Sequence, residues 1–421
     1  MIAVSDRTIR SLEDFDRPTL VRWRNAIVAA FAVGGVALST WGPRLPAIRA
    51  DLHVGTGGLG VLLAGITVGS VTGLLVSTPI LGWLGPRRAL PAAMLLIAVA
   101  VTVVGVGAGA LKSVPVVAVG FVVAGVAIGT LDVMINVEGA AIERAFGRTL
   151  MPFMHGAWSA GAALGSGIGA GCAALNISPA VQFSAEAALI VGIALAIAAA
   201  IPDGSREAQA SAAARSPRAA RFRVWLLGWT DWTLLMIGLV MLGAELGEGS
   251  ANNWLTLAAS EDHGRPAAIA ALFFTAFAIG ETTARILGGP VVDRLGRVRT
   301  VRITSIVGIL GISLFILVGN PAVMLIAVLL WAIGVSMGFP LGMSAAAESG
   351  PNPAARVSVV ASIGYFANLA GPPAVGFLAQ ETSLLTALWL VALLFLIAAA
   401  AAGALRPRAS TPRTGNRPAQ L

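Results

Sequence analysis

Residues 288–299 read GGPVVDRLGRVR and form a short basic stretch between two long apolar runs. Gly296 permits a tight turn, because glycine lacks the Cβ that would clash at positive φ. Asp293 can accept hydrogen bonds at the N-terminus of a neighbouring helix, where the helix dipole favours an anion. The anionic inner surface of a membrane would hold the loop through three arginines, Arg294, Arg297 and Arg299. The stretch therefore predicts a tight cytoplasmic turn between two membrane-spanning helices.

The composition agrees with a lipid environment. Hydrophobic residues make up 57% of the 421 residues, and only 11% are charged. A water-soluble chain of this length needs far more charge to cover its surface. The net charge of +8 comes from arginines in short clusters between apolar runs, which indicates a membrane protein and not a nucleic-acid-binding stripe. The single cysteine, Cys172, excludes an intramolecular disulfide.

Twelve runs are long and apolar enough to span a bilayer, since a spanning helix needs about 20 mainly apolar residues. The sequence therefore predicts an all-α membrane protein with twelve transmembrane helices in two six-helix bundles. The runs are 25–46, 58–82, 89–110, 115–142, 152–175, 180–201, 232–258, 267–291, 300–319, 322–346, 357–379 and 383–404.

The basic residues predict how the chain is oriented. With both termini inside, the cytoplasmic loops contain 14 Lys or Arg residues and the opposite loops contain 4. Basic residues concentrate on the cytoplasmic side, so both termini are predicted to be cytoplasmic. The expected units are an N-terminal tail, a first bundle, a linker, a second bundle and a C-terminal tail, at 1–24, 25–201, 202–231, 232–404 and 405–421.

The two bundles also resemble each other in sequence. Gly125-x3-Gly129 recurs as Gly334-x3-Gly338 after 209 positions, Gly161 matches Gly371 after 210, and Gly85 matches Gly296 after 211. Three matches at nearly one offset, each in the corresponding span or loop, indicate an internal duplication. Transporters often have such repeats, with the substrate held between them near the bilayer midplane.

The opening stretch resembles the signature loop of the major facilitator superfamily, G-x-x-x-D-R-x-G-R-[RK]. Gly289 is its first glycine, Asp293, Arg294, Gly296 and Arg297 match, and Val298 departs from the last position. The first-half copy, 82–88, keeps a glycine and two arginines but has no Asp. In the family that Asp helps to latch the halves together, so the resemblance moves this expectation to the second-half loop.

A finer resemblance begins at Phe153 and runs through Met-His155-Gly-Ala-Trp158-Ser-Ala-Gly161. Together with Asp132, Asn136, Gly139 and Asn253-Trp254, it is similar to a bacterial inner-membrane branch near the fucose-permease-like members. This resemblance implies sugar-like or other small polar solutes coupled to protons.

Span four carries Asp132 and Asn136, which are four residues apart and share a helical face. A charge in hydrocarbon costs about 2.5–3.5 kcal/mol on insertion scales, so Asp132 needs a polar neighbour or a role. We predict a proton-coupling or solute-binding carboxylate; the alternative is a structural hydrogen bond. His155 opens span five, where it is either a proton relay with Asp132 or a histidine near the headgroups. Glu143 is predicted to form a surface or loop salt bridge.

In span seven, Glu245, Glu248 and Asn252 follow i, i+3, i+7 spacing and share a face. Glu245 is close to mid-span, and we predict that it is a protonatable binding group. The alternative is a buried acid paired with an arginine. The glycines around these residues make the stretch easy to unwind, as in the broken helices of transporters.

Three further residues complete the predicted site: Trp158, Tyr365 and Asn368. Tyr365 comes 210 positions after His155, so the repeat places both side chains toward a central cavity. Trp158 and Tyr365 could stack on a solute ring. Glu281 and Arg285, four residues apart in span eight, are predicted to form a structural ion pair.

These observations predict a secondary transporter that works by alternating access, with proton-coupled symport of a sugar-like or other small polar compound. A proton-driven antiporter that exports drugs or metabolites is the alternative within the class, and a non-transporting membrane sensor is the alternative outside it. We expect no enzyme activity, because no cluster of acids or histidines is visible at one interface, and no nucleic-acid partner, because the arginines form no single stripe. No cofactor and no metal are expected, because no ATP-binding or metal-ligand spacing is present. The partners would be the solute, protons and the lipid bilayer, and the chain would be a monomer in the bacterial inner membrane.

Overall fold

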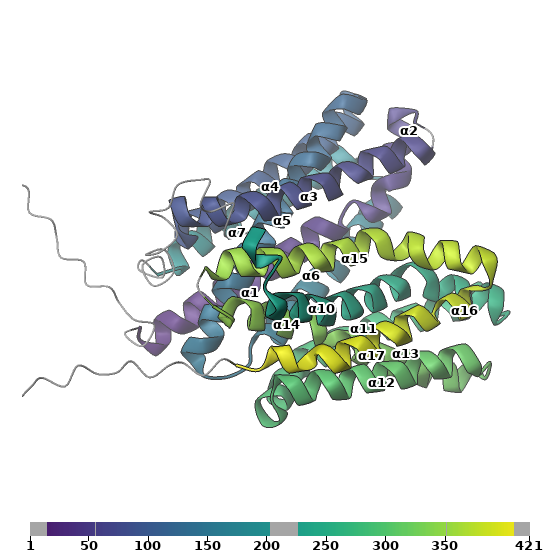
Figure 1. Cartoon of the computed structure of the whole chain (residues 1–421). Helices are drawn as coiled ribbons and strands as arrows, with labels where there is room; N and C mark the ends of the chain where they lie inside the picture. The colour runs from purple at the N-terminus through teal and green to yellow at the C-terminus, as the bar shows by residue number, and fades with distance from the viewer. Residues whose placement is uncertain (1–14, 55, 203–225, 351, 408–421) are drawn as a thin grey trace, which may run out of the picture.

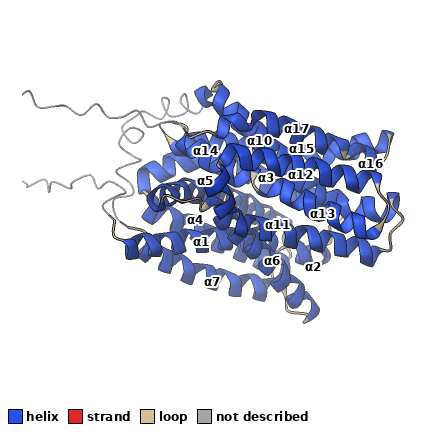
Figure 2. Cartoon of the chain, turned by 90° about the horizontal axis from the view of Figure 1, so that it is seen from below, coloured by secondary structure: helices blue, strands red, loops and turns tan. Residues whose placement is uncertain are grey.

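The computed structural model describes residues 15–54, 56–202, 226–350 and 352–407, which form helices and loops without a strand (Figure 2). The first half contains α1 (Arg17–Ser39), η2 (Gly42–Arg44), α2 (Leu45–Leu52), α3 (Thr56–Leu84), α4 (Pro86–Gly109), α5 (Val114–Phe146), α6 (Met151–Ala174) and α7 (Pro179–Ala200). Six of these are long helices, as the hydropathy pattern predicts.

The second half also contains six long helical segments. They are α10 (Trp232–Ser250) with η3 (Ala251–Leu255) and η4 (Ala258–Asp262); α11 (Ala267–Leu295); α12 (Arg297–Leu317); α13 (Pro321–Ser336) with α14 (Gly338–Glu348); α15 (Pro353–Glu381); and α16 (Leu384–Ala387) with α17 (Trp389–Ala401) and η5 (Ala402–Leu405). The tenth and twelfth segments are therefore interrupted, and most of the predicted linker lies outside the described residues.

Figure 1 shows two ends of the molecule that are used as landmarks below. The terminal end holds the start of α1 and the end of η5, and the distal end holds α2 and α16. Helix α1 begins at Arg17, eight positions before the predicted span, because Asp16 accepts a hydrogen bond from the Thr19 N–H and so caps the helix.

The duplication seen in the sequence has a counterpart in the backbone. Gly85 has φ 71° and ψ 162°, and Gly296 has φ 78° and ψ 156°. Each is the N-cap of the next helix, α4 and α12 respectively. A residue with a Cβ rarely adopts this conformation, so glycine is required at the same joint in both halves.

Three of the long helices, α6, α11 and α15, carry polar groups that bind across the two halves. Nine segments in the described part of the chain are long and apolar enough to span a membrane. Helix α11 packs against α6, and α15 packs against α3, so all three lie where the halves meet. His155 of α6, Glu281 of α11 and Ser358 of α15 are buried there, where protein neighbours replace lipid around the polar group.

Small residues bring neighbouring helices within each half into backbone contact. A Cβ placed on Gly161 of α6 would lie 2.1 Å from the Ala32 carbonyl oxygen of α1. Gly125 of α5 approaches α3 equally closely, since its Cβ would lie 2.1 Å from the Ile66 carbonyl oxygen. Such smooth faces are typical of membrane helix packing. They fix the helices that position the site.

Candidate functional site

A cavity of about 420 Å³ lies between the two halves. Both halves contribute to it, through α1, α3, α5 and α6 on one side and α10, η3, α11, α14 and α15 on the other. The lining residues are Leu38, Ile66, Thr67, Ser70, Asp132, His155, Trp158, Glu245, Glu248, Asn252, Arg285, Phe339 and Tyr365.

The first half supplies a buried polar chain that begins at Asp132. The Asn136 side-chain amide donates to the Asp132 backbone oxygen at 2.9 Å and to its carboxylate Oδ1 at 3.1 Å. Asn136 Oδ1 lies 3.1 Å from His155 Nε2 and accepts from it when that nitrogen carries the proton. Asn136 therefore links the two titratable groups from behind the cavity wall.

His155 is held between two aromatic rings. The ring of Phe31, in α1, has its centroid 5.0 Å away, and the ring of Phe339, in α14, has its centroid 5.3 Å away. Both contacts are edge-to-face. Because Phe339 belongs to the second half, the imidazole is part of the contact between the halves.

The second half centres on Arg285 of α11, whose side chain is only 6% exposed. Arg285 Nη2 lies 2.6 Å from Glu248 Oε2, and Nη1 lies 2.7 Å from Glu281 Oε1. Nη1 also donates to the Ser159 hydroxyl of the first half at 2.8 Å. The predicted Glu281–Arg285 ion pair is present, but Arg285 also lines the cavity and joins the halves. The sequence prediction of a purely structural pair is therefore incomplete.

Seven predicted site residues line the cavity: Asp132, His155, Trp158, Glu245, Glu248, Asn252 and Tyr365. Glu245 lies beside α15, since a Cβ on Gly364 would be 3.4 Å from Glu245 Cγ. Asn252 lies in η3, where the stretch that its glycines make easy to unwind is helical and widens to a π-helix. The side chain of Asn368 lies outside the described residues.

Sequence reasoning missed Thr67, Ser70, Ser159 and Phe339. Thr67 and Ser70 come from α3, which the sequence marks only as an apolar run with small polar residues. Their spacing of three residues places them on one face, and this is the signal that could have found them.

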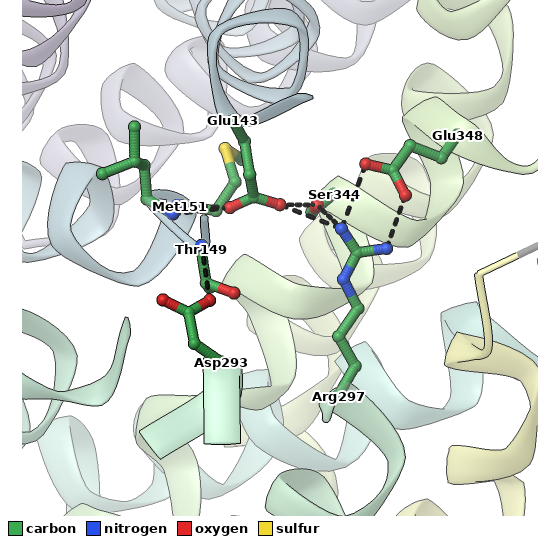
Figure 3. A network of polar contacts seen from close by, with 8 residues as sticks. Glu143, Thr149, Met151, Asp293, Arg297, Ser344 and Glu348 are labelled. Atoms are coloured by element: carbon green, nitrogen blue, oxygen red, sulfur yellow. Dashed lines mark hydrogen bonds and ion pairs between the residues drawn. The ribbon is translucent and has the colours of Figure 1, made fainter. Parts of the chain in front are cut away.

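A second cluster of polar contacts closes the terminal end (Figure 3). Arg297 Nη2 lies 2.9 Å from Glu143 Oε1 in the first half, and Nη1 lies 2.7 Å from Glu348 Oε2. The Ser344 hydroxyl donates to Glu143 Oε1 and accepts a hydrogen bond from Arg297 Nη2. The prediction that Arg297 faces the lipid surface is wrong, because carboxylates of both halves enclose its guanidinium. Arg294 and Arg299 are exposed.

Glu143 forms the predicted salt bridge, with Arg297, but it is not a surface residue. It is 5% exposed, and its Oε2 accepts from the backbone N–H groups of Leu150 and Met151 at 2.7 and 2.9 Å. Asp293 Oδ1 accepts from the Thr149 N–H at 2.6 Å. Two carboxylates, one from each half, therefore satisfy the unpaired N–H groups where α6 begins. Gly289 packs beside the Thr149 carbonyl, where a Cβ would lie 2.7 Å from the oxygen.

Comparison with known proteins identifies the family. An uncharacterized MFS-type transporter of Yersinia pestis is 30% identical over 377 residues, covering 89% of this chain and 94% of that protein. Residues 237–421 also match the family model described as Major Facilitator Superfamily. The chain belongs to the major facilitator superfamily. It is accordingly a multi-pass membrane transporter and not an enzyme.

Solved structures of the superfamily share this fold. The fucose:proton symporter FucP of E. coli, in an outward conformation, superposes with a TM-score of 0.75 at 13% identity, over 92% of this chain and 99% of that one. The human organic anion transporter MFSD10 superposes with a TM-score of 0.73 at 13% identity, over 91% and 99%. Proteins with such different substrates share one architecture, so the substrate depends on the residues of the cavity.

Proposed function

We propose that this transporter is a proton-coupled symporter that moves a small polar solute, sugar-like or of similar size, by alternating access. The observation that carries the proposal is the position of carboxylates from both halves around one cavity, Asp132 from α5 and Glu245 and Glu248 from α10. A carboxylate that takes up a proton loses its charge and crosses the hydrophobic layer at lower cost. The cavity is formed within one chain, which supports a monomer.

The proposed arrangement places both termini in the cytoplasm of a bacterium and the protein in its inner membrane. In that arrangement, the contacts of Arg297, Glu143 and Asp293 close the cytoplasmic side. Ser358 of α15 adds to this closure, because its hydroxyl donates to the Leu74 carbonyl of α3 at 2.9 Å. The cavity then takes up solute and proton from the outside.

Glu245 is the proposed principal proton carrier, because it lies at mid-span and lines the cavity from the second half. We expect that Glu245→Gln, which cannot ionise, reduces proton-driven uptake to the level of empty vesicles. The measurement is solute uptake in proteoliposomes under an imposed pH gradient, with the solute found by a ligand-stabilisation screen of purified protein.

Glu261→Gln is the matched control, since Glu261 is an exposed acid of the same helical segment and lies outside the cavity lining. It should transport like the wild type. If Glu245→Gln kept the wild-type pH dependence, Glu245 would have no part in coupling.

A proton antiporter is the second candidate, favoured by the excess of acids over bases around the cavity. The direction of proton movement distinguishes the two functions. When solute is added outside proteoliposomes, a symporter acidifies the lumen and an antiporter makes it alkaline, and a pH-sensitive dye in the lumen reads the sign.

A further inference from the structure

The cavity wall carries an unequal number of charged groups. Three acids line it, Asp132, Glu245 and Glu248, and a fourth, Glu281, lies directly behind. Arg285 is the one arginine among the lining residues that the structure describes, and no described lysine joins it. The single imidazole, His155, adds at most one further positive charge. Acidic groups therefore outnumber basic groups in the cavity lining.

Arg285 is the lining residue that could bind an anionic solute despite the excess of acids, but it is poorly placed to do so. Its two terminal nitrogens are already within 2.6 and 2.7 Å of carboxylates, and Ser159 accepts a further hydrogen bond. Of the guanidinium nitrogens of Arg285, only Nε is buried without a partner in the described part of the chain, so an incoming carboxylate or phosphate could make a two-point contact with the guanidinium only by displacing Glu248 or Glu281. Either displacement would leave a second negative charge beside the newcomer.

Asp132, in contrast to the terminal nitrogens of Arg285, has a hydrogen-bond acceptor without a donor. The residue is 5% exposed, and its Oδ2 is buried with no hydrogen-bond partner among the described residues. An unmet acceptor in a membrane cavity favours a ligand that brings an N–H or O–H group. Trp158, Tyr365 and Phe339 line the same space, and their ring faces attract cations.

We infer that the cavity selects cationic solutes, amines that carry hydrogen-bond donors, over anions of the same size. This inference rests on the proposed transport function and narrows the small polar solute of that function to an amine. Two acids on opposite halves make it compatible with symport, because one carboxyl can hold the proton while the other pairs with the amine. It also distinguishes this chain from an organic anion transporter of similar fold.

The charge preference can be measured without knowing the solute. Thr67→Cys reports from the first half and Asn252→Cys from the second, each in a Cys172→Ala background so that one thiol remains. Each protein is treated with a cationic and an anionic methanethiosulfonate, carrying trimethylammonium and sulfonate groups. The two rates are divided by the rates of the same reagents with 2-mercaptoethanol.

We expect the normalised rate of the cationic reagent to exceed that of the anionic one by about tenfold or more at low salt, because an anionic cleft concentrates cations. Adding Asp132→Asn and Glu245→Gln should bring the ratio toward one, and so should high salt. A ratio near one, or one that favours the sulfonate, would overturn the inference. The second reporter keeps the test valid if the first variant fails to fold.

Transport and charge selectivity can fail independently. A cation-selective cavity in a protein without proton-driven uptake would refute the proposed function and leave this inference standing. Proton-driven uptake of a carboxylate or of an uncharged sugar would support the proposed function and refute this inference. Among solutes that stabilise the purified protein, amines are therefore the expected class.

Discussion

Asp231 is an ionised group outside the membrane-spanning segments that joins two helix starts in the second half. Its Oδ1 accepts from the Thr233 and Leu234 N–H groups, and its Oδ2 lies 2.7 Å from Arg356 Nη2 at the beginning of α15. Burial raises the pKa of Asp231, but the hydrogen bond and the positive charge of Arg356 outweigh it, so the pKa lies below the ordinary value of 3.8.

The lowered pKa of Asp231 predicts how the contact between Asp231 and Arg356 depends on pH. Asp231→Asn keeps a good helix cap and removes the charge, so it should lower stability near neutral pH by about 1 kcal/mol or less. A carboxyl whose pKa is lowered in the folded state stabilises the fold at pH values above its unfolded-state pKa. That stabilisation is lost as the pH falls through the folded-state pKa. Thermal unfolding in detergent should therefore show a difference at pH 7 that shrinks below pH 3.8. A constant difference at every pH would contradict the ionic role.

Helical spacing predicts contacts at the residue scale only within one helix. Asp132 and Asn136 share a face because 3.6 residues make one turn, and their side chains do meet. Spacing contains no information on how one helix is rotated against another. Spacing therefore pairs Arg285 with Glu281 alone, although Glu248 and Ser159 approach it from two other helices. The burial of Glu143 is hidden from the sequence for the same reason.

Close packing of α1 and α6 determines where Trp158 and His155 stand. Gly161→Ala would place a methyl group against the α1 backbone, which cannot yield like a flexible side chain. We expect a loss of about 1–3 kcal/mol, the usual cost of overpacking, read as a lower unfolding temperature. The solute-binding affinity should also fall, because α1 and α6 must move apart and so displace Trp158 and His155.

Gly167 provides the control on the same helix. A Cβ there has no neighbour within 4 Å, so Gly167→Ala should be neutral or slightly stabilising through better helix propensity. Equal effects of the two substitutions would show that helix propensity, and not the approach of α1, governs α6.

Hydropathy predicts all twelve long helical segments, because each contains a run of about 20 mainly apolar residues. It does not show that α6, α11 and α15 carry polar groups that bind across the two halves. The break at Met337 and the π-helices η3 and η4 are also invisible to hydropathy, because they follow from packing and not from polarity.

At the scale of the whole molecule, the duplicated halves close through unequal loops. Asp293 accepts from Thr149 where α6 begins, whereas Gly82 stands at the equivalent position 211 residues earlier and has no carboxylate to offer. The repeat predicts two equivalent joints, and the backbone has them at Gly85 and Gly296. The side chains that bind across the halves are not duplicated, so closure depends on the second-half loop and Arg297.

Arg297→Ala should therefore open the terminal end. Breaking a buried ion pair costs about 3–5 kcal/mol, but Glu143 keeps donors from Leu150, Met151 and Ser344, so the loss will be smaller. Even about 1.4 kcal/mol shifts the equilibrium between closed and open forms tenfold.

Ser358 provides the readout for this opening, because it is fully buried against α3 when the halves are closed. With Ser358→Cys in a Cys172→Ala background, N-ethylmaleimide should label the Arg297→Ala protein at least about tenfold faster than its parent. Arg299→Ala removes an exposed arginine two positions along the same helix and should leave the rate unchanged. Equal labelling of all three proteins would mean that apolar packing alone holds the halves together, because the ionic network would then contribute nothing to closure.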